Sequence, residues 1–228
     1  MAKIFCINSV PRAGTHMLGT ALNAHPAMHV YGEIFNKNHH DGQVFENETV
    51  PQALRRMRQR KDVKQIGFCV HRGAVPAVER EVHREAEKKL PAELRTIILW
   101  RENYFRQFVS LRRAQAVGAW TVEQGWDMPE YVPVTLTVDE TQAFFKRMMA
   151  QNGPPTRRYK RAVRVSYEQL IADFQSHITR VLKFLGVRVI PLVPVTVKTG
   201  VPLRQAVTNY DELKMTFAKT QWSNFFDE

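Results

Sequence analysis

Short apolar runs alternate along this chain with longer segments in which apolar residues recur at helical spacing. Apolar runs bounded by turn-forming residues are typical of buried strands, and the longer segments are typical of amphipathic helices. The predicted strands are residues 4–7, 28–30, 66–70, 95–100 and 162–165, and the predicted helices are 17–24, 51–60, 76–90, 103–116, 138–151, 173–185 and 209–219. This alternation predicts an α/β fold in which helices flank a central, mainly parallel sheet.

Two residues mark the ends of predicted helices. Gly186 follows the 173–185 helix, and glycine commonly ends a helix because it adopts a left-handed conformation without steric cost. Asn209 opens the last helix as an N-cap, with Asp211 and Glu212 in the first turn.

The size of the chain predicts a single domain over residues 1–228. Hydrophobic residues make up 44% of the chain, enough for one sizeable core, and no linker or repeat interrupts it. Cys6 and Cys69 fall in predicted strands, which predicts buried thiols. No apolar run reaches the ~20 residues of a membrane span and no secretory segment precedes the first strand, so we expect a cytoplasmic protein.

The fold class also predicts where a ligand would bind. In parallel sheets, ligands bind beyond the carboxyl ends of the strands. The residues that follow predicted strands, and that we therefore expect on one rim, are 11–16, Gly32 and Glu33, His71 and Arg72, and Arg101.

The segment between the first strand and the first helix is the main candidate site. It runs Val-Pro-Arg-Ala-Gly-Thr-His over residues 10–16. Gly14 lets backbone approach an anion, Thr15 and His16 open a helix whose N–H groups point at it, and Arg12 can bind two of its oxygens. A nucleoside triphosphatase would have a lysine after the glycine, which this chain lacks. The alternative is an ordinary turn with a surface arginine.

A second candidate site follows the 95–100 strand. Arg101 ends this strand, and Ser110 lies two turns into the next helix. A charge and a hydroxyl in these places can converge on one phosphate. The alternative is a capped strand end and a buried helix serine.

The net charge of +11 raises nucleic acid as a partner. Residues 55–64 hold six basic residues and one acid, and residues 157–164 hold five basic residues and no acid. Neither cluster is interleaved with aromatic residues, as a base-stacking surface would be. The interpretations left open are a solvated face, an electrostatic funnel toward a polyanionic small donor, and a nucleic-acid surface.

Three segments together resemble one enzyme family. They are SVPRAGTHML near the start, ILWRENYFRQFVSLRRAQAVGAW in the middle and VSYEQLIADFQSHITRVLKFLGV later. Their order and spacing are similar to those of sulfotransferases that use PAPS (3'-phosphoadenosine 5'-phosphosulfate). The chain resembles most the bacterial carbohydrate branch, with the trehalose and Nod-factor sulfotransferases, and VTVKTGVPLRQAVTNYDELKMTF resembles the donor-closing tail of that branch.

The resemblance implies a P-loop-like sulfotransferase fold and a role for each matching residue. The 5'-phosphosulfate loop would be Pro11, Arg12, Ala13, Gly14, Thr15 and His16, and the 3'-phosphate pair would be Arg101 and Ser110. Tyr167 would brace the adenosine end, and Lys198 lies where the family often places a cation near the donor. Ala13 replaces the more usual serine, which removes one hydroxyl from a loop that acts mostly through its backbone.

The acceptor hydroxyl needs a base, and Glu33 is the leading candidate. Glu33 follows the short 28–30 strand near the loop, and the resembled branch uses a carboxylate from a similar place. His16 and His71 are alternative bases, and each of the three could instead be structural. His39, His40 and Asp41 lack a further ligand at metal spacing, so no metal site is expected.

The sequence thus predicts a sulfotransferase that moves a sulfuryl group from PAPS to a hydroxyl of a carbohydrate or glycolipid and releases PAP. Residues 118–133, with Trp120, Trp126 and Tyr131, would suit stacking on a sugar face, and otherwise form a packed loop or the contact of a homodimer. The alternatives are a P-loop kinase of small molecules and a basic nucleic-acid-binding protein. No specific nucleic acid and no membrane span are expected.

Overall fold

The computed structural model describes residues 2–36, 45, 47–71, 94–118, 120, 131–152, 161–194 and 200–227. The chain divides into two compact units. The sheet unit consists of Met1–Trp100 and Pro154–Val195, and the helical unit consists of Arg101–Gly153 and Thr196–Glu228. The single domain expected over 1–228 stays a prediction. No helix in the described ranges has both the length and the apolar character needed to cross a membrane.

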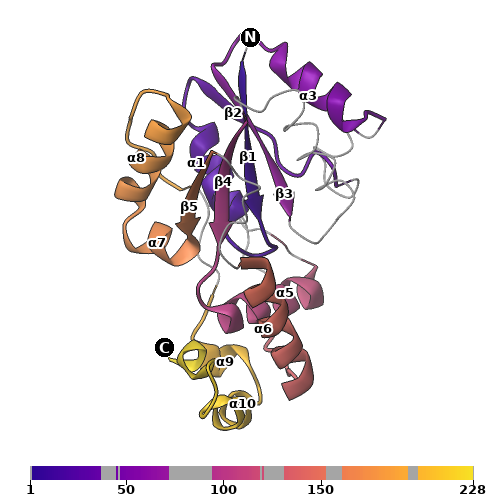
Figure 1. Ribbon diagram of the computed structural model, residues 1–228. Coiled ribbons are helices and arrows are strands. Elements are labelled where there is room, and N and C mark those ends of the chain that lie inside the picture. The colour runs from indigo at the N-terminus through magenta and orange to yellow at the C-terminus, as the bar shows by residue number, and fades with distance from the viewer. Residues whose placement is uncertain are drawn as a thin grey trace. The chain divides into compact units, whose positions relative to one another are not determined.

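The sheet unit is built on five parallel strands (Figure 1). In chain order they are β1 (Lys3–Ser9), β2 (Met28–Val30), β3 (Gln65–His71), β4 (Arg95–Trp100) and β5 (Ala162–Ser166). They lie in the order β2-β3-β1-β4-β5, and every neighbouring pair is parallel. The predicted α/β fold with a central parallel sheet is therefore confirmed, because each of the five expected runs forms a strand.

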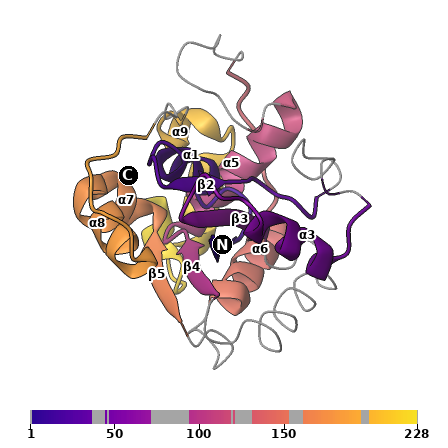
Figure 2. The same ribbon diagram turned by 90° about the horizontal axis from the view of Figure 1, so that it is seen from above.

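Helices cover both faces of this sheet. Its helices are α1 (Thr15–Asn23), α3 (Val50–Arg58), α7 (Tyr167–Ala172) and α8 (Phe174–Leu185). Helix α3 buries Ala53 and Met57 against Cys6 and Phe68, and α1 lies on the opposite face, as right-handed connections require (Figure 2). This two-sided cover is why every residue of β1 after Lys3 is buried and why the strands read as continuous apolar runs.

The helical unit is held together by an aromatic core. Its elements are α5 (Tyr104–Val117), α6 (Val138–Asn152), α9 (Leu203–Ala206), α10 (Tyr210–Phe217) and the 3-10 helix η1 (Ser223–Phe226). The rings of Phe105 and Phe226 lie 4.4 Å apart, and those of Phe108 and Phe144 stack at 4.6 Å. Aromatic pairs at such distances add to the stabilisation from burial.

Asn209, the predicted N-cap of the last helix, bonds to a different segment in the structure. Asn209 stands at the N-cap position of α10, but its side chain makes no capping hydrogen bond. Its Oδ1 accepts from the Leu136 backbone N–H at 3.2 Å, and its Nδ2 donates to the Leu136 carbonyl at 2.8 Å. Asn209 therefore ties the segment before α6 to the start of α10, a contact between residues far apart in sequence.

Most predicted helices appear with boundaries within about two residues. The predicted 173–185 helix matches α8, which Asp173 caps and Gly186 ends with a φ of 70°. Helices α9 and η1 were not predicted, and the predicted 76–90 helix lies outside the described residues. Cys6 and Cys69 are both buried, as expected.

We predict that Gly67→Ala destabilises the protein by about 1–3 kcal/mol, because it overpacks the sheet. A Cβ at Gly67 would lie 2.3 Å from Cζ of Phe5, whose ring is fully buried and has no space to move. The free energy of unfolding is measured by chemical denaturation. Gly19→Ala is the matched control, since a Cβ there meets only Val30 at 3.7 Å and alanine favours the helix. Equal stability of the two variants would contradict the prediction.

Candidate active site

Three neighbouring strands end side by side at one edge of the sheet. Ser9 and His71 are the last residues of β1 and β3, and they are direct partners in the parallel register. Backbone hydrogen bonds continue the β2–β3 pairing past Val30, from Tyr31 N to Gly67 O and from Cys69 N to Gly32 O, each at 2.9 Å. This pairing places Glu33, the residue after Gly32, beside His71.

The side chains of these three residues form a hydrogen-bonded row. Oε1 of Glu33 lies 2.9 Å from Nε2 of His71, and Nδ1 of His71 lies 2.8 Å from Oγ of Ser9. We call Ser9, His71 and Glu33 the strand-end row. Asn36 Nδ2 also donates to Oε2 of Glu33 at 2.8 Å. The predicted base and one of its two alternatives are therefore direct neighbours.

The predicted anion-binding segment, residues 10–16, follows Ser9 directly, and we call it the anion loop. Arg12 has a φ of 64°, in the left-handed region that residues other than glycine rarely occupy, and Gly14 has a φ of 92°. Helix α1 starts after Gly14, with Leu18 N donating to Gly14 O at 3.1 Å, and no side-chain hydrogen bond caps it. The first N–H groups of a helix and its dipole attract anions, so the loop has the architecture that the sequence predicts.

Tyr167, which follows the edge strand β5, contacts the same loop. It opens α7 directly after Ser166, whose hydroxyl accepts from Gln169 N at 3.0 Å as part of a capping box. A Cβ on Gly14 would lie only 2.7 Å from Cδ2 of the Tyr167 ring. The structure therefore brings Tyr167 onto the loop, while its contact with adenosine stays a prediction.

The other predicted site residues are placed as follows. Arg101 follows the last residue of β4 and Ser110 lies on α5, both within the helical unit. Lys198, His39, His40, Asp41 and Arg72 lie outside the described residues. Within the described ranges, no three His, Cys, Asp or Glu side chains gather as metal ligands would.

Two hydrogen-bonding partners at the strand ends were not singled out from the sequence, namely Ser9 and Asn36. The only signal for Ser9 was its place at a strand end, and the parallel register with His71 was needed to give it a partner. Asn103 was also missed: its Oδ1 caps α5 by accepting from Arg106 N, and its Nδ2 donates to Phe225 O at 3.0 Å.

The aromatic segment 118–133 is described only in part. The Trp120 side chain is 50% exposed, so one ring remains accessible to a ligand. The Arg113 guanidinium lies 4.0 Å from the centre of the Tyr131 ring, and burial raises the pKa of the Tyr131 hydroxyl. Residues 121–130, which include Trp126, lie outside the described residues.

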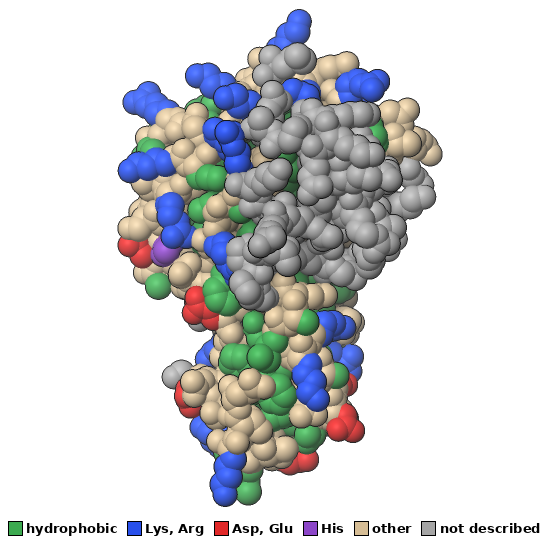
Figure 3. Space-filling view, viewed as in Figure 1, with side chains coloured by type: hydrophobic (Ala, Val, Ile, Leu, Met, Phe, Trp, Pro, Cys, Tyr) green, Lys and Arg blue, Asp and Glu red, His purple; other side chains and the backbone are tan. Residues whose placement is uncertain are grey.

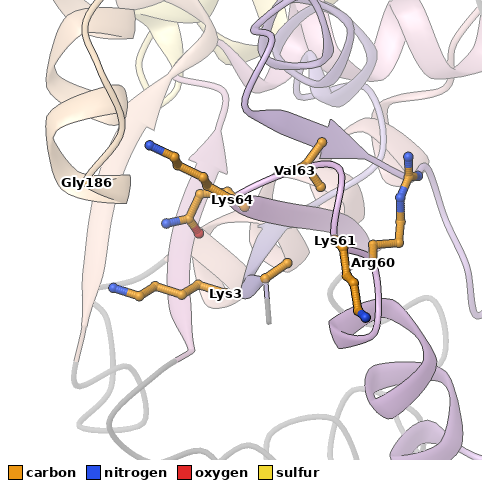
Figure 4. A pocket seen from close by; sticks show the side chains of 8 residues that line it. Lys3, Arg60, Lys61, Val63, Lys64 and Gly186 are labelled. Atoms are coloured by element: carbon orange, nitrogen blue, oxygen red, sulfur yellow. The ribbon is translucent and has the colours of Figure 1, made fainter.

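A basic pocket lies at the other end of the sheet. Lys3 and Gln65, the first residues of β1 and β3, line a pocket of about 380 Å³ together with Arg60, Lys61 and Lys64 (Figure 4). Lys and Arg also outnumber Asp and Glu on the visible face of the sheet unit (Figure 3). At roughly 3.3 Å per strand residue, this pocket is about 20 Å from the strand-end row.

Within this basic region, Arg60 is paired. Its guanidinium hydrogen-bonds both carboxylate oxygens of Asp62, and this bond lowers the pKa of Asp62 to about 2. Three basic residues of the 55–64 cluster, Arg60, Lys61 and Lys64, therefore lie at the amino end of the sheet and not in the anion loop.

Known proteins resemble this chain in sequence and in fold. Nodulation protein H of Rhizobium meliloti (strain 1021) is 25% identical over 236 residues, covering 98% of this chain and 94% of the relative. Nodulation protein H of Rhizobium tropici is 25% identical over 247 residues, covering 98% and 92%. No family model matches the chain. The crystal structure of a sulfotransferase from Alicyclobacillus acidocaldarius superposes with a TM-score of 0.55 at 15% identity, covering 96% of this chain and 92% of that one.

The chain thus resembles nodulation protein H in sequence and a sulfotransferase in fold. In this fold the predicted anion loop directly follows β1, the central strand of the sheet.

We predict that Gly14→Ala lowers the rate of sulfuryl transfer as well as stability. A left-handed alanine costs about 1–2 kcal/mol, and the new methyl group would also push Tyr167 away from the loop. Gly186→Ala is the control, because Gly186 also has a positive φ, of 70°, but faces the end of the flexible Arg95 side chain. Both variants lose stability in denaturation, and only Gly14→Ala loses activity. A fully active Gly14→Ala would remove this loop geometry from the mechanism.

Proposed function

We propose that this protein is a sulfotransferase that moves the sulfuryl group of PAPS to a hydroxyl group of a carbohydrate or glycolipid acceptor. The structure of the loop favours an anionic donor. Arg12, in an unusual left-handed conformation, lies just before the start of α1, so its positive charge and the first N–H groups of the helix are close in the chain. The motif resemblance to the carbohydrate branch supports the acceptor class.

One observation carries the proposal. A carboxylate, Glu33, stands at the same sheet edge as the anion loop, linked through His71 to Ser9, the residue just before that loop. Transfer to an alcohol needs both parts: positive potential where the donor's charged groups lie, and a proton acceptor for the attacking hydroxyl. The strand ends supply the two from adjacent segments.

The residues suggest an in-line reaction. The acceptor oxygen attacks sulfur, the bond from sulfur to the 5'-phosphate oxygen breaks, and Glu33 takes the hydroxyl proton. The products are a sulfate ester, PAP and a proton held by the carboxylate. As in phosphoryl transfer, the protein mainly positions the reactants and stabilises charge, here through Arg12 and the backbone N–H groups after Gly14.

The left-handed Arg12 fits this role. A non-glycine residue in this region costs of order 1–3 kcal/mol, and such strain concentrates at functional sites. Here the conformation is followed directly by the tight turn that ends in the positive φ of Gly14. We propose that the protein accepts this cost because it sets the direction in which the Arg12 side chain leaves the loop.

The 3'-phosphate assignment rests on the sequence resemblance. Arg101 and Ser110 match the residues that hold this phosphate in PAPS-dependent sulfotransferases, and both stay proposals, as does Lys198. The group distinguishes PAP from 5'-AMP and ATP, so ligand preference tests the donor directly.

We predict that PAP raises the melting temperature more than 5'-AMP does, and more than ATP with magnesium. A ligand in hundredfold excess over its dissociation constant stabilises the folded state by about 2.7 kcal/mol. Arg101→Ala should reduce the effect of PAP to that of 5'-AMP, whereas Arg188→Ala, a basic residue after α8, should change nothing. Equal stabilisation by ATP with magnesium would contradict the PAPS assignment.

We predict that Glu33→Gln lowers kcat by ~10²–10⁴-fold, the usual contribution of a general base. Glutamine keeps the size of the side chain but does not accept the proton, so PAP affinity should hardly change. The rate is measured by release of PAP with a panel of carbohydrate acceptors, and PAP affinity by calorimetry. A Glu33→Gln variant that turns over normally would exclude Glu33 as the base.

A further inference from the structure

We propose that Ser9 and His71 are positioning residues that hold the Glu33 carboxylate in place beside the anion loop, and that His71 is not itself the base. This inference rests on the proposed function, because it concerns the proton acceptor of the same transfer. It is carried by the two hydrogen bonds of the strand-end row, at 2.8 and 2.9 Å.

With Glu33 ionised and His71 neutral, only one tautomer of His71 satisfies both hydrogen bonds. An ionised carboxylate only accepts hydrogen bonds, so Nε2 of a neutral His71 donates to Glu33. Nδ1 is then an acceptor, and the Ser9 hydroxyl donates to it. The lone pair with which His71 could take a proton is therefore occupied by Ser9, and its other nitrogen already bears a hydrogen.

The exposed fractions of the three side chains also favour Glu33 over His71 as the base. The His71 side chain is 10% exposed and Ser9 is fully buried, whereas the Glu33 side chain is 28% exposed. The carboxylate is the member of the row that an incoming hydroxyl can reach. The two Glu33 oxygens lie against different partners, Oε1 against His71 and Oε2 against Asn36.

The row also connects the base to the loop. Ser9 is held in the sheet by its register with His71, and the loop begins at the next residue, Val10. A displacement of about 1 Å at a reacting group can cost about 10²-fold in rate. By spanning the ends of three adjacent strands, the row sets the distance between Glu33 and the residues after Ser9.

The proton balance of this arrangement is simple. The acceptor hydroxyl gives its proton to Glu33 as the oxygen–sulfur bond forms, and His71 keeps its own proton on Nε2 throughout. After the sulfate ester leaves, the partly exposed Glu33 returns the proton to water. No proton passes through Ser9.

The test compares His71→Gln with His71→Ala. Glutamine still offers an N–H donor to Glu33 but does not accept a proton, whereas alanine offers neither. A positioning role predicts that His71→Ala lowers kcat by about 10²-fold with little change in the KM for PAPS, and that His71→Gln restores most of that loss. If His71 is the base, both variants are equally inactive, which would overturn the proposal.

The chain offers a matched control at His25. This histidine is 2% exposed and both of its nitrogens are bonded, Nδ1 accepting from Ala27 N at 3.0 Å and Nε2 lying 2.9 Å from Arg188 O. His25→Gln should change stability but not kcat. Thermal melting and PAP binding of every variant show whether a lost rate reflects lost folding.

A second measurement tests the row without any assay of activity. Nitrogen-15 NMR of the full chain should show His71 protonated on Nε2, and Ser9→Ala should shift the Nδ1 resonance. A proton on Nδ1 would overturn the row even if the protein uses PAPS. Conversely, a confirmed Nε2 proton in a protein that transfers no sulfate would leave the row standing and reject the proposed function.

Discussion

The parallel register among β2, β3 and β1 is the constraint on which the site depends. Because Ser9 and His71 are direct partners in that register, their side chains meet at the carboxyl end of the sheet. The backbone bond from Cys69 to Gly32 extends the same register to Glu33. A shift of one residue in either pairing would send alternate side chains to the other face and break the row.

The anion loop uses the sheet as a rigid support. It leaves the central strand, whose residues are buried from Ile4 to Ser9, and it turns at once through two left-handed residues, Arg12 and Gly14. The ring of Tyr167 packs so closely on Gly14 that no side chain fits there. The loop is thus packed against α7, an element that follows it by about 150 residues of chain.

Basic residues lie in different surroundings at the two ends of the sheet. At the carboxyl end, Arg12 belongs to a loop with a defined backbone conformation. At the amino end, Lys3, Lys61 and Lys64 surround an open pocket, and Arg60 is already paired with Asp62. Net charge alone therefore does not identify the site, since basic residues also gather about 20 Å away from the strand-end row.

Local patterns in the sequence determined the strands, most of the helices and the anion loop, because apolar spacing and a glycine before a helix act over a few residues. The same patterns singled out Glu33 and His71 as separate candidates. Only the tertiary structure decided that they are neighbours, that Ser9 completes their row, and that Asn209 bonds to Leu136 instead of capping its helix. These contacts depend on which distant segments pair and in what register, and that is a property of the whole folded chain.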